Sequence, residues 1–501
     1  MTTAAPVSAP PASTRPALLG NPLRLLIDGL WVDGSAEPLQ IMDPSTGARL
    51  VESAAASSGD VDRAVAAARR ALESGPWGAM PASERARLLQ RLADGMEENA
   101  EELAVLESLN CGKPIGVTRS FEIPSAIETF RYNAGWATKL NGETRDVSLP
   151  GTWHAFTLRQ AVGVVGLIVP WNAPLAITAS KMAAALAAGC TVVLKPAELT
   201  PLTAVRLAEL ALEAGFPPGV VNVVQGLGPE AGQRLADHPD VDKISFTGST
   251  AVGKRLLASC AGNLKRVSLE LGGKSPVVIY PDADLDRAIP GAAMGIFGNT
   301  GQICAAGSRL YVHEAIADEV IAGIAAVAEN LVLGPGLAAG TQLGPVISEV
   351  QRRRVLEYVD SGRAEGAEVV TGGAGVAGDG FFVQPTVLRH TTAQMRVVRE
   401  EIFGPVLSAA TFTDEESIAG VVARANDTDH GLSSTIWTRD ISRALRFARG
   451  VKAGNVRVNA SAGMDPNMPF GGFKQSGWGK ENGREGVEAY TETKSVAINI
   501  G

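Results

Sequence analysis

The sequence predicts an α/β fold built on a doubly wound parallel sheet. From residue 162 onward, short runs that are apolar on both faces alternate with longer amphipathic runs. Strands buried on both faces read as continuous apolar segments, whereas helices show a period near 3.6 residues. Many of the 56 glycines fall between these runs and indicate tight turns. This alternation is typical of a parallel sheet that is covered by helices on both faces.

The first half of the chain contributes the predicted sheet and its helices. Helical periodicity marks 60–74 and a longer run, 83–114, which ends at Gly112 and Pro114. Residues 146–161 alternate polar and apolar side chains, which predicts a hairpin arm between helices. Strands are expected at 162–170, 190–196, 220–226 and 241–249, with helices at 174–189, 200–215 and 250–262.

After about residue 275 the alternation resumes and predicts a second α/β unit. A glycine-rich loop at 371–389 leads into one of its strands, and the tail at 493–500 alternates like a final strand. The remaining strands are expected at 275–280, 308–312, 431–438 and 454–460, with helices at 283–302, 313–332 and 441–450.

Composition argues against several classes of function. The net charge is -8, and the densest basic run, RRR at 352–354, lies in a helical segment, so nucleic-acid binding is not expected. No apolar run approaches the length of a membrane span, so no membrane association is expected. Residues 1–22 are rich in Ala, Pro, Ser and Thr and lack a signal-peptide core, which predicts a disordered arm.

The four cysteines have no spacing that suits zinc, and they are too few for a disulfide framework. We therefore expect no metal site and a reducing, cytoplasmic setting. Cys111, Cys190 and Cys260 lie in or beside helical runs and are interpreted as structural. Cys304 lies between a helix and a strand, among small residues. It is either buried filler or a nucleophile. Its small neighbours would let a substrate approach, and a thiolate there would be a strong nucleophile.

Polar residues follow the predicted strands where a doubly wound sheet binds ligands. Asn172, in PWNAP, suits an oxyanion donor, or alternatively an Asx-type turn. Lys195 and Glu198, in KPAE, suit a nucleotide ribose, or alternatively form a surface ion pair. Gly248 and Ser249 open the helix after the fourth strand, where phosphate is attracted.

Glu270 is a lone carboxylate in an apolar strand and is followed by two glycines. Burial would raise its pKa toward neutrality, which suits a general base. The alternative is a charge on an edge strand that faces water. The Gly-Gly turn directly after Glu270 favours the functional interpretation.

Taken together, these motifs resemble the aldehyde dehydrogenase superfamily. The resemblance covers the chain from roughly residue 25 to its end, and the separation of Glu270 from Cys304 also matches. The motifs, which occur in the family's order, are PWNAP, KPAE, FTGST, ELGGKSP, GQICAAGSR, EEIFGPV and PFGGFKQSGWGKENG.

The resemblance implies a role for each matching residue. Cys304 corresponds to the nucleophile, Glu270 to the general base and Asn172 to the oxyanion-hole amide. Lys195 and Glu198 match contacts to the adenosine ribose, Glu401 and Phe403 match the nicotinamide end, and Gly248 and Ser249 match the pyrophosphate region. Further family positions are Trp171 and Lys181, and the substrate pocket is implied at Ala173, Ala176, Ile177, Ser180, Ile303 and Phe470.

The resemblance also implies a domain plan and an activity. A disordered arm is expected at 1–22. The NAD-binding domain would span 23–145 and 163–274, the catalytic domain 275–470, and the β oligomerisation arm 146–162 with 485–501. NAD, or alternatively NADP, would accept hydride from a small-molecule aldehyde through a cysteine thioester, in a homodimer or homotetramer.

Three questions stay open at this level. Transfer of the thioester to coenzyme A is one alternative, although such enzymes usually lack the carboxylate found here at Glu270. A non-catalytic binding or structural protein on the same fold is another. The small side chains expected in the pocket favour a bulky, uncharged aldehyde, aromatic or of medium chain length, but Arg457 or Asp465 would bring charge to the pocket mouth.

Overall fold

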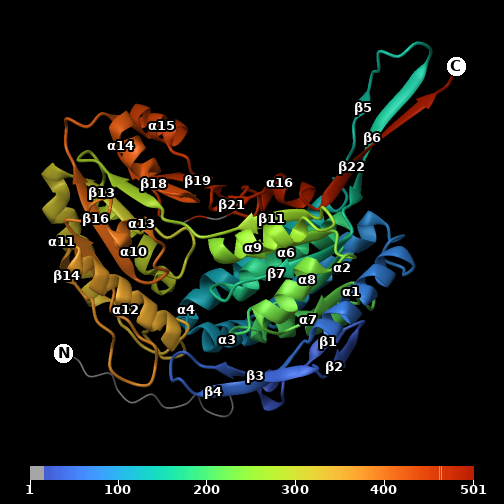
Figure 1. The fold of residues 1–501 in the computed structure, drawn as a ribbon, viewed down its shortest axis with the longest axis horizontal. Coiled ribbons are helices and arrows are strands. Elements are labelled where there is room, and N and C mark those ends of the chain that lie inside the picture. The colour runs from blue at the N-terminus through green and yellow to red at the C-terminus, as the bar shows by residue number, and fades with distance from the viewer. Residues whose placement is uncertain (1–15, 462, 464) are drawn as a thin grey trace.

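The computed structural model describes residues 16–461, 463 and 465–501. Figure 1 shows two α/β lobes, one formed mainly by the first half of the chain and one by the second half, with a long arm that projects from the first lobe. The C-terminal segment returns from the second lobe to the first, where β21 (Gly477–Trp478) pairs with β11 (Arg266–Glu270) and α16 (Gly483–Glu488) contacts α6 (Pro174–Ala188).

The first lobe contains an eight-stranded sheet whose central strands are parallel. The strand order reverses between β7 and β10, which is the switch point where doubly wound sheets bind ligands. In spatial order the strands are β2 (Leu30–Val32), β1 (Leu25–Ile27), β9 (Val221–Val223), β8 (Thr191–Lys195), β7 (Val164–Ile168), β10 (Lys243–Thr247), β11 (Arg266–Glu270) and β21 (Gly477–Trp478).

Helices cover both faces of this sheet, as the apolar runs predicted. On one face α2 (Ala82–Glu98), α5 (Ile123–Trp136), α6 (Pro174–Ala188) and α7 (Leu202–Glu213) pack against Val165 and Leu167. On the other, α1 (Ser58–Glu73), α8 (Gln233–Asp237) and α9 (Thr250–Cys260) pack against Val164 and Ile168. Alternate residues of β7 therefore serve opposite cores.

The single long helix expected at 83–114 is wrong, because the chain forms α2 and then a separate α3 (Ala100–Cys111). Asn99 lies between them with non-helical angles, and its side-chain Nδ2 donates to the oxygen of Gly95 at 2.8 Å. Asparagine competes for backbone partners in this way and interrupts helices. The second helix ends, as expected, at Gly112, whose φ is +76°.

The second lobe is a seven-stranded sheet that is parallel except at one edge. Its strands, in spatial order, are β14 (Glu368–Thr371), β15 (Thr386–Arg389), β16 (Val406–Phe412), β13 (Arg309–His313), β12 (Pro276–Ile279), β18 (Ser433–Trp437) and β19 (Asn455–Val458). Its helices are α10 (Leu285–Phe297) and α11 (Ala317–Asn330) on one face, α14 (Ile418–Asn426) and α15 (Ile441–Gly450) on the other, and α12 (Glu349–Ala364) with α13 (Arg396–Arg399) over β15 and β16.

Short elements connect these layers. Small sheets pair β3 (Ala36–Met42) with β4 (Arg49–Ala55), and β17 (His430–Gly431) with β20 (Phe473–Lys474). The short helical turns are η2 (Ala17–Gly20), α4 (Ile115–Val117), η3 (Thr118–Glu122), η4 (Gly228–Gly232), η5 (Gly298–Gly301), η6 (Glu314–Ile316) and α16 (Gly483–Glu488).

The arm consists of β5 (Thr144–Arg145), β6 (Trp153–Ala161) and β22 (Thr491–Asn499). Its bounds differ from the expected 146–162 and 485–501, because β5 begins earlier and residues 485–488 belong to α16. The expected disordered arm at 1–22 also differs: residues 17–20 form η2, and Leu19 is buried against Leu23 and Ile41. Residues 1–15 lie outside the described residues.

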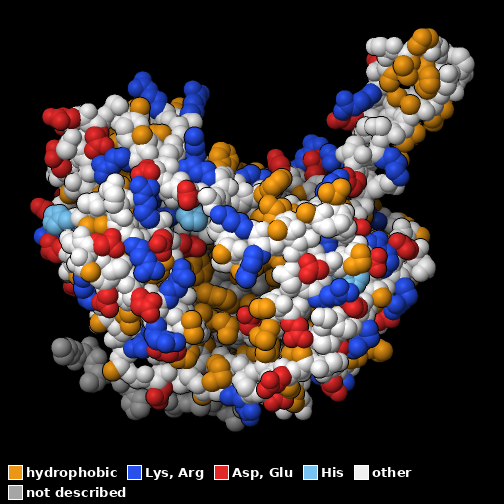
Figure 2. Space-filling model, viewed as in Figure 1, with side chains coloured by type: hydrophobic (Ala, Val, Ile, Leu, Met, Phe, Trp, Pro, Cys, Tyr) orange, Lys and Arg blue, Asp and Glu red, His pale blue; other side chains and the backbone are white. Residues whose placement is uncertain are grey.

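The first sheet faces the boundary between the lobes with the carboxyl ends of its strands, and the second sheet faces it with the amino ends of its strands. Asn172 and Ser249 follow the carboxyl ends of β7 and β10, whereas Cys304, Glu401 and Leu432 precede the strands β13, β16 and β18. The space-filling view is hollowed between the lobes, with hydrophobic side chains along the hollow (Figure 2).

Candidate active site

Cys304 lies at the end of an unusual left-handed turn. Asn299, Thr300 and Gly301 have φ of +47°, +55° and +71°, a region that L-residues adopt rarely. A Cβ on Gly301 would lie 2.0 Å from the oxygen of Gly404, so only glycine fits there. The turn leaves Cys304 partly exposed, whereas the other three free cysteines are buried.

The environment of Cys304 favours the neutral thiol. Burial raises its pKa to about 12, and the negative charges of Glu270 and Glu401 contribute to the increase. In this state the group is a thiol at neutral pH, and it must lose its proton as it attacks a substrate. The nucleophilic interpretation therefore requires help from groups around the site.

Asn172 is bonded to the segment that carries Cys304. Its Nδ2 donates to the main-chain oxygen of Gln302 at 2.9 Å, and Asn299 Nδ2 donates to the main-chain oxygen of Asn172 at 2.9 Å. The side chain thus bonds across the lobe boundary instead of closing an Asx-type turn. An amide nitrogen carries two hydrogens, so one donor remains for a developing oxyanion.

Glu270 ends β11 and is buried, not exposed at an edge, because β10 and β21 flank the strand. Its Oε2 has no hydrogen-bond partner among the described residues. Burial raises its pKa well above the usual value, the charge of Glu481 adds to the increase, and Lys181 and Lys480 oppose it. A carboxyl group in this condition suits proton transfer near neutral pH.

Lys181 and Glu481 form a buried pair beside Glu270 that sequence reasoning did not identify. Lys181 Nζ contacts Glu481 Oε1 and also Ser245 Oγ at 3.0 Å. The sequence marks Lys181 only as a family position and does not single out Glu481, because 300 residues separate the two along the chain. Local periodicity carries no signal for such a pairing.

The two glycines after Glu270 allow the segments of the candidate site to approach one another. A Cβ on Gly272 would lie 2.3 Å from Glu401 Oε2, and a Cβ on Gly273 would lie 2.1 Å from the main-chain oxygen of Cys304. The N–H of Gly273 also donates to Glu401 Oε1 at 2.9 Å. The ELGGKSP motif therefore brings Glu270, Cys304 and Glu401 together.

Trp171 and Phe403 also meet at this boundary. Their rings pack edge to face with centroids 5.2 Å apart. Phe403 has a φ of +59°, which is strained for an aromatic residue, and its oxygen accepts a hydrogen bond from Gln351 Nε2 at 2.8 Å. The geometry holds the loop that bears Glu401 against the loop that bears Asn172.

The residues expected to bind a dinucleotide lie at the carboxyl ends of strands of the first sheet. Lys195 Nζ lies 2.9 Å from Glu198 Oε2; Lys195 is buried, while Glu198 keeps 40% of its side chain exposed. The two side chains therefore form an ion pair, as the alternative interpretation expected. The pair nevertheless lies at the carboxyl end of β8, where a doubly wound sheet binds its ligand. Ser249 caps α9 by accepting from the N–H of Val252 at 3.3 Å, and Gly248 packs on the Phe246 ring.

These features fit a dinucleotide. The exposed Glu198 carboxylate suits ribose hydroxyls at one end, the amino end of α9 suits phosphate, and the Glu401 carboxylate suits a second ribose near Cys304. Burial raises the pKa of Glu401, although the Gly273 N–H and Lys274 oppose the increase.

The expected pocket residues lie on one face of α6. Ala173, Ala176, Ile177 and Ser180 are partly exposed, whereas Leu175, Thr178 and Ala179 between them are buried. Ser180 Oγ donates to Asn482 Oδ1 at 2.8 Å.

Two further pocket candidates come from other segments. Ile303 is partly exposed and packs against the second lobe's core. Phe470 is buried and exchanges two backbone hydrogen bonds with Glu481, which places it close to the Lys181–Glu481 pair.

Arg457 brings a cation near Cys304. Its Nη1 donates to Ser433 Oγ at 3.0 Å, and it forms no ion pair with any residue that the structure describes. Burial lowers its pKa, and interaction with Cys304 opposes that change. A partly buried guanidinium with so few partners is available to an acceptor on a substrate.

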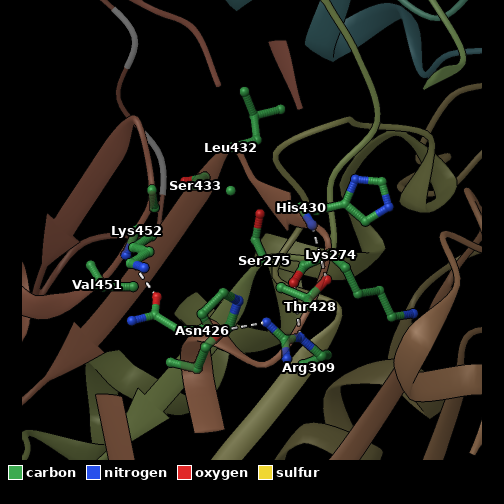
Figure 3. Close-up of a pocket in the computed structure, with 14 residues that line it drawn as sticks. Lys274, Ser275, Arg309, Asn426, Thr428, His430, Leu432, Ser433, Val451 and Lys452 are labelled. Carbon is green, nitrogen blue, oxygen red and sulfur yellow. Dashed lines mark hydrogen bonds between the residues drawn. The ribbon is translucent and has the colours of Figure 1, made fainter. Parts of the chain in front are cut away.

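A separate cavity in the second lobe contains none of the candidate catalytic residues (Figure 3). The side chain of Lys274 extends away from it, and Arg309 Nε donates to the main-chain oxygen of Lys274 at 2.8 Å. Ser433 lines the cavity as well as contacting Arg457. We therefore assign the cavity to the packing of the second lobe and not to substrate binding.

Within 16–461, 463 and 465–501, no group of three or more His, Cys, Asp or Glu side chains is placed to hold a metal ion. Over the same residues, no helix combines the length and the apolar character needed to cross a membrane.

Comparisons with known proteins agree with this geometry. The family model for the aldehyde dehydrogenase family matches residues 31–496. Phenylacetaldehyde dehydrogenase of Pseudomonas fluorescens is 47% identical over 97% of this chain and 98% of its own, and aldehyde dehydrogenase 1A1 of Gallus gallus is 46% identical over 95% and 93%. The solved NAD+ complex of an aldehyde dehydrogenase from Bacillus cereus superposes with a TM-score of 0.95 at 45% identity, over 97% of this chain and 98% of that one. The chain belongs to the aldehyde dehydrogenase family, whose members use NAD or NADP as the hydride acceptor.

Proposed function

We propose that the chain oxidises an aldehyde to the carboxylic acid with Cys304 as nucleophile, Asn172 as oxyanion donor and Glu270 as general base. The observation that supports this most strongly is the convergence of three distant segments. Asn172 bonds to the oxygen of Gln302, Gly273 packs on the oxygen of Cys304, and the charge of Glu270 acts on the Cys304 thiol.

The residues divide the reaction into two stages. Cys304 loses its proton to solvent water as its sulfur attacks the carbonyl carbon, and the resulting oxyanion accepts hydrogen bonds from Asn172 Nδ2 and the Cys304 N–H. NAD+, when bound, supplies the hydride acceptor. Loss of hydride from the thiohemiacetal leaves a thioester on Cys304, which water hydrolyses.

Glu270 performs the second stage. Its free Oε2 accepts a proton from the water that attacks the thioester carbon. The carboxylic acid then leaves, and Glu270 gives the proton it took from water to the Cys304 sulfur. Lys181 and Lys480 hold positive charge near Glu270 and so limit how far burial raises its pKa.

The assay that tests this proposal measures NADH formation from an aldehyde with and without coenzyme A. We expect the carboxylic acid as product, at a rate that coenzyme A does not change. An acyl-coenzyme A product would favour the transferase alternative. No NADH with any aldehyde would favour a non-catalytic binding or structural role.

The substrate pocket favours a bulky, uncharged aldehyde, either aromatic or of medium chain length. The exposed positions of α6 are small or aliphatic, and none carries a charge. The likeness to phenylacetaldehyde dehydrogenase of Pseudomonas fluorescens supports this choice. A hydrophobic pocket discriminates by about 10–200-fold for each methylene that it packs well.

Arg457 favours a second candidate, an aldehyde that also carries a carboxylate. Its guanidinium interacts with Cys304 and has Ser433 as its hydrogen-bond partner, so it has donors to spare. The two candidates differ in one measurable respect, since removal of the Arg457 charge affects only the second.

The cofactor, the assembly and the location follow from other features. The exposed Glu198 carboxylate would repel a 2′-phosphate, which favours NAD over NADP.

The arm exposes Val147, Leu149, Leu158, Ile498 and Ile500. Figure 2 shows hydrophobic side chains gathered at its tip, which favours a homodimer or homotetramer through this element. Four free cysteines favour a reducing compartment such as the cytoplasm.

A further inference from the structure

Two consecutive residues of α6 contact two consecutive residues near the C-terminus. Ser180 Oγ donates to Asn482 Oδ1 at 2.8 Å, and Lys181 Nζ contacts Glu481 Oε1. Ser180 is partly exposed on the face of α6 that is expected to line the pocket, whereas Lys181 is buried. The helix of the proposed pocket is therefore bonded to the segment that carries Glu481.

The backbone of Asn482 is strained. Its φ is +57° and its ψ is 175°, a combination that glycine adopts but that other residues rarely do. A residue in such a conformation persists only where its surroundings hold it. Here Ser180 Oγ holds the side chain, and the N–H of Gly486 donates to the main-chain oxygen of Asn482 at 2.8 Å. Backbone strain of this kind is typical of functional sites and points to a role for the Ser180 bond.

The backbone around residues 471–480 passes Glu270 on two sides. In the pair formed by β11 and β21, Gly477 lies opposite Glu270. A Cβ on Gly471 would lie 2.6 Å from Glu270 Oε1, so the main chain at Gly471 lies directly against the carboxylate. Lys480 Nζ donates to the oxygen of Gly471 at 2.7 Å and holds it there. A shift of this backbone therefore changes the surroundings of the Glu270 carboxylate.

The two passes are joined next to Asn482. Phe470 and Glu481 exchange two backbone hydrogen bonds, of 2.7 and 2.8 Å, so the loop around Glu270 closes at the residue before Asn482. The backbone angles of Asn482 set the direction in which the chain continues from Glu481. If Asn482 relaxed to an unstrained conformation, Glu481 would turn with it.

The charged groups that act on Glu270 come from three places. Burial raises the pKa of Glu270, the charge of Glu481 adds to the increase, and Lys181 and Lys480 oppose it. Glu270 in turn contributes to the raised pKa of the Cys304 thiol. If Glu481 turned away, its charge would no longer raise the pKa of Glu270, and Lys181 would lose the partner that balances its charge. Both changes lower the pKa of Glu270.

We propose that Ser180 is a positioning residue that acts on the general base through Asn482. Its hydrogen bond keeps Asn482 in the strained conformation, and that conformation holds the Glu481 carboxylate against Lys181. The same serine thus belongs to the pocket wall and to the support of the base. This inference rests on the proposed role of Glu270 as the general base.

The test compares Ser180→Ala with Ser180→Thr, which keeps a hydroxyl. The measurement is the decay of the acyl-enzyme formed in a single turnover, followed by rapid mixing over a range of pH. Hydrolysis requires ionised Glu270, so its rate rises with pH through the pKa of that group, and a lower pKa moves the rise to lower pH. For Ser180→Ala, at a pH on the lower part of the wild-type rise, we expect the fraction of the maximal rate to increase by about threefold or more. Ser180→Thr should keep the wild-type profile.

A double-mutant cycle with Glu481→Gln shows whether Ser180 acts through the segment that follows from Asn482. Glu481→Gln should by itself move the rise to lower pH, because it removes the charge that adds to burial. Ser180→Ala should then add little to the shift in the Glu481→Gln background. Independent, additive shifts would overturn the inference. A shift in Ser180→Thr as large as that in Ser180→Ala would also overturn it, because side-chain size would then be the cause.

Two further variants serve as control and substitute. Ser361 is a partly exposed serine of α12 whose Oγ donates to the oxygen of Tyr358 at 3.0 Å, and Ser361→Ala should leave the pH profile unchanged. If Ser180→Ala does not fold, Asn482→Leu removes the acceptor of the same bond and should show the same shift.

Failure of this inference can be told apart from failure of the proposed function. Acyl-enzyme that decays at the wild-type rate in Glu270→Gln would overturn the assignment of the general base. Slow decay in Glu270→Gln, together with a wild-type pH profile in folded Ser180→Ala, would leave the base in place and overturn the positioning role alone.

Discussion

The side-chain Nδ2 of Asn172 donates to the main-chain oxygen of Gln302 at 2.9 Å, so the end of β7 is bonded to the segment that presents Cys304. The bond uses one of the two amide hydrogens and orients the other. It also couples the two lobes at the place where a substrate carbonyl would lie.

Asn172→Ala should therefore lower kcat by about 10²–10³-fold, the usual loss for one oxyanion donor. The measurement is steady-state turnover at saturating aldehyde and NAD, with binding of NAD to the free protein as the control. An increase in KM for the aldehyde at unchanged kcat would mean that Asn172 positions the substrate and does not stabilise charge.

Cys304→Ala should abolish NADH formation while NAD still binds, because no other described thiol is exposed. Matched replacements of Cys111, Cys190 and Cys260 by Ala remove buried thiols and should leave kcat nearly unchanged, although each creates a small cavity. Full turnover in the Cys304 variant would exclude the thioester mechanism.

Glu270→Gln should have opposite effects on two reactions. Hydrolysis of the thioester should slow by about 10²–10⁴-fold, so that rapid mixing detects an accumulated acyl-enzyme. Alkylation of Cys304 in the cofactor-free protein should become faster, because the charge of Glu270 contributes to raising the thiol pKa to about 12. Removing that charge lowers the pKa and increases the thiolate fraction at a given pH.

In the wild-type protein, Cys304 alkylation should rise about tenfold for each pH unit through the neutral and mildly alkaline range, because the thiol pKa lies above that range. An alkylation rate that is already constant at neutral pH would contradict the raised pKa. Unaltered steady-state turnover in Glu270→Gln would exclude its role as general base.

Glu198→Gln should improve the use of NADP relative to NAD. The substitution removes the negative charge at the ribose position, while Lys195 stays beside it and offers a partner for a phosphate. The readout is the ratio of kcat/KM for the two cofactors with one aldehyde. A wild-type protein that already prefers NADP would show that Glu198 turns away from the cofactor.

Arg457→Met should leave the oxidation of phenylacetaldehyde or hexanal largely intact and should impair only aldehydes that carry a carboxylate. The reason is that methionine keeps an apolar wall but removes the donors that now reach Ser433. The panel compares acetaldehyde, hexanal, phenylacetaldehyde, betaine aldehyde and succinate semialdehyde. If succinate semialdehyde is the best wild-type substrate and depends on Arg457, the uncharged pocket is the wrong interpretation.

Local patterns in the sequence were sufficient for most of the fold. Continuous apolar runs predicted the buried strands β7, β8 and β10, because parallel strands are apolar on both faces. The break at Asn99 escaped this reasoning, since apolar periodicity continues across it while the asparagine side chain bonds to Gly95.

By itself the sequence determined which chemistry the protein carries. Cys304, Glu270 and Asn172 stand in short motifs next to glycines and prolines, and their chemical types and order are readable without coordinates. The glycines carry information because close approach excludes a Cβ, as at Gly272 and Gly273.

Only the tertiary structure decided which distant side chains act on those residues. Lys181 contacts Glu481 beside Glu270, although 300 residues separate the two along the chain. The Arg457 guanidinium donates a hydrogen bond to Ser433 Oγ at 3.0 Å. Such contacts depend on how two sheets and their helices pack, and buried charges take their pKa values from all the neighbours that packing supplies, which no local pattern specifies.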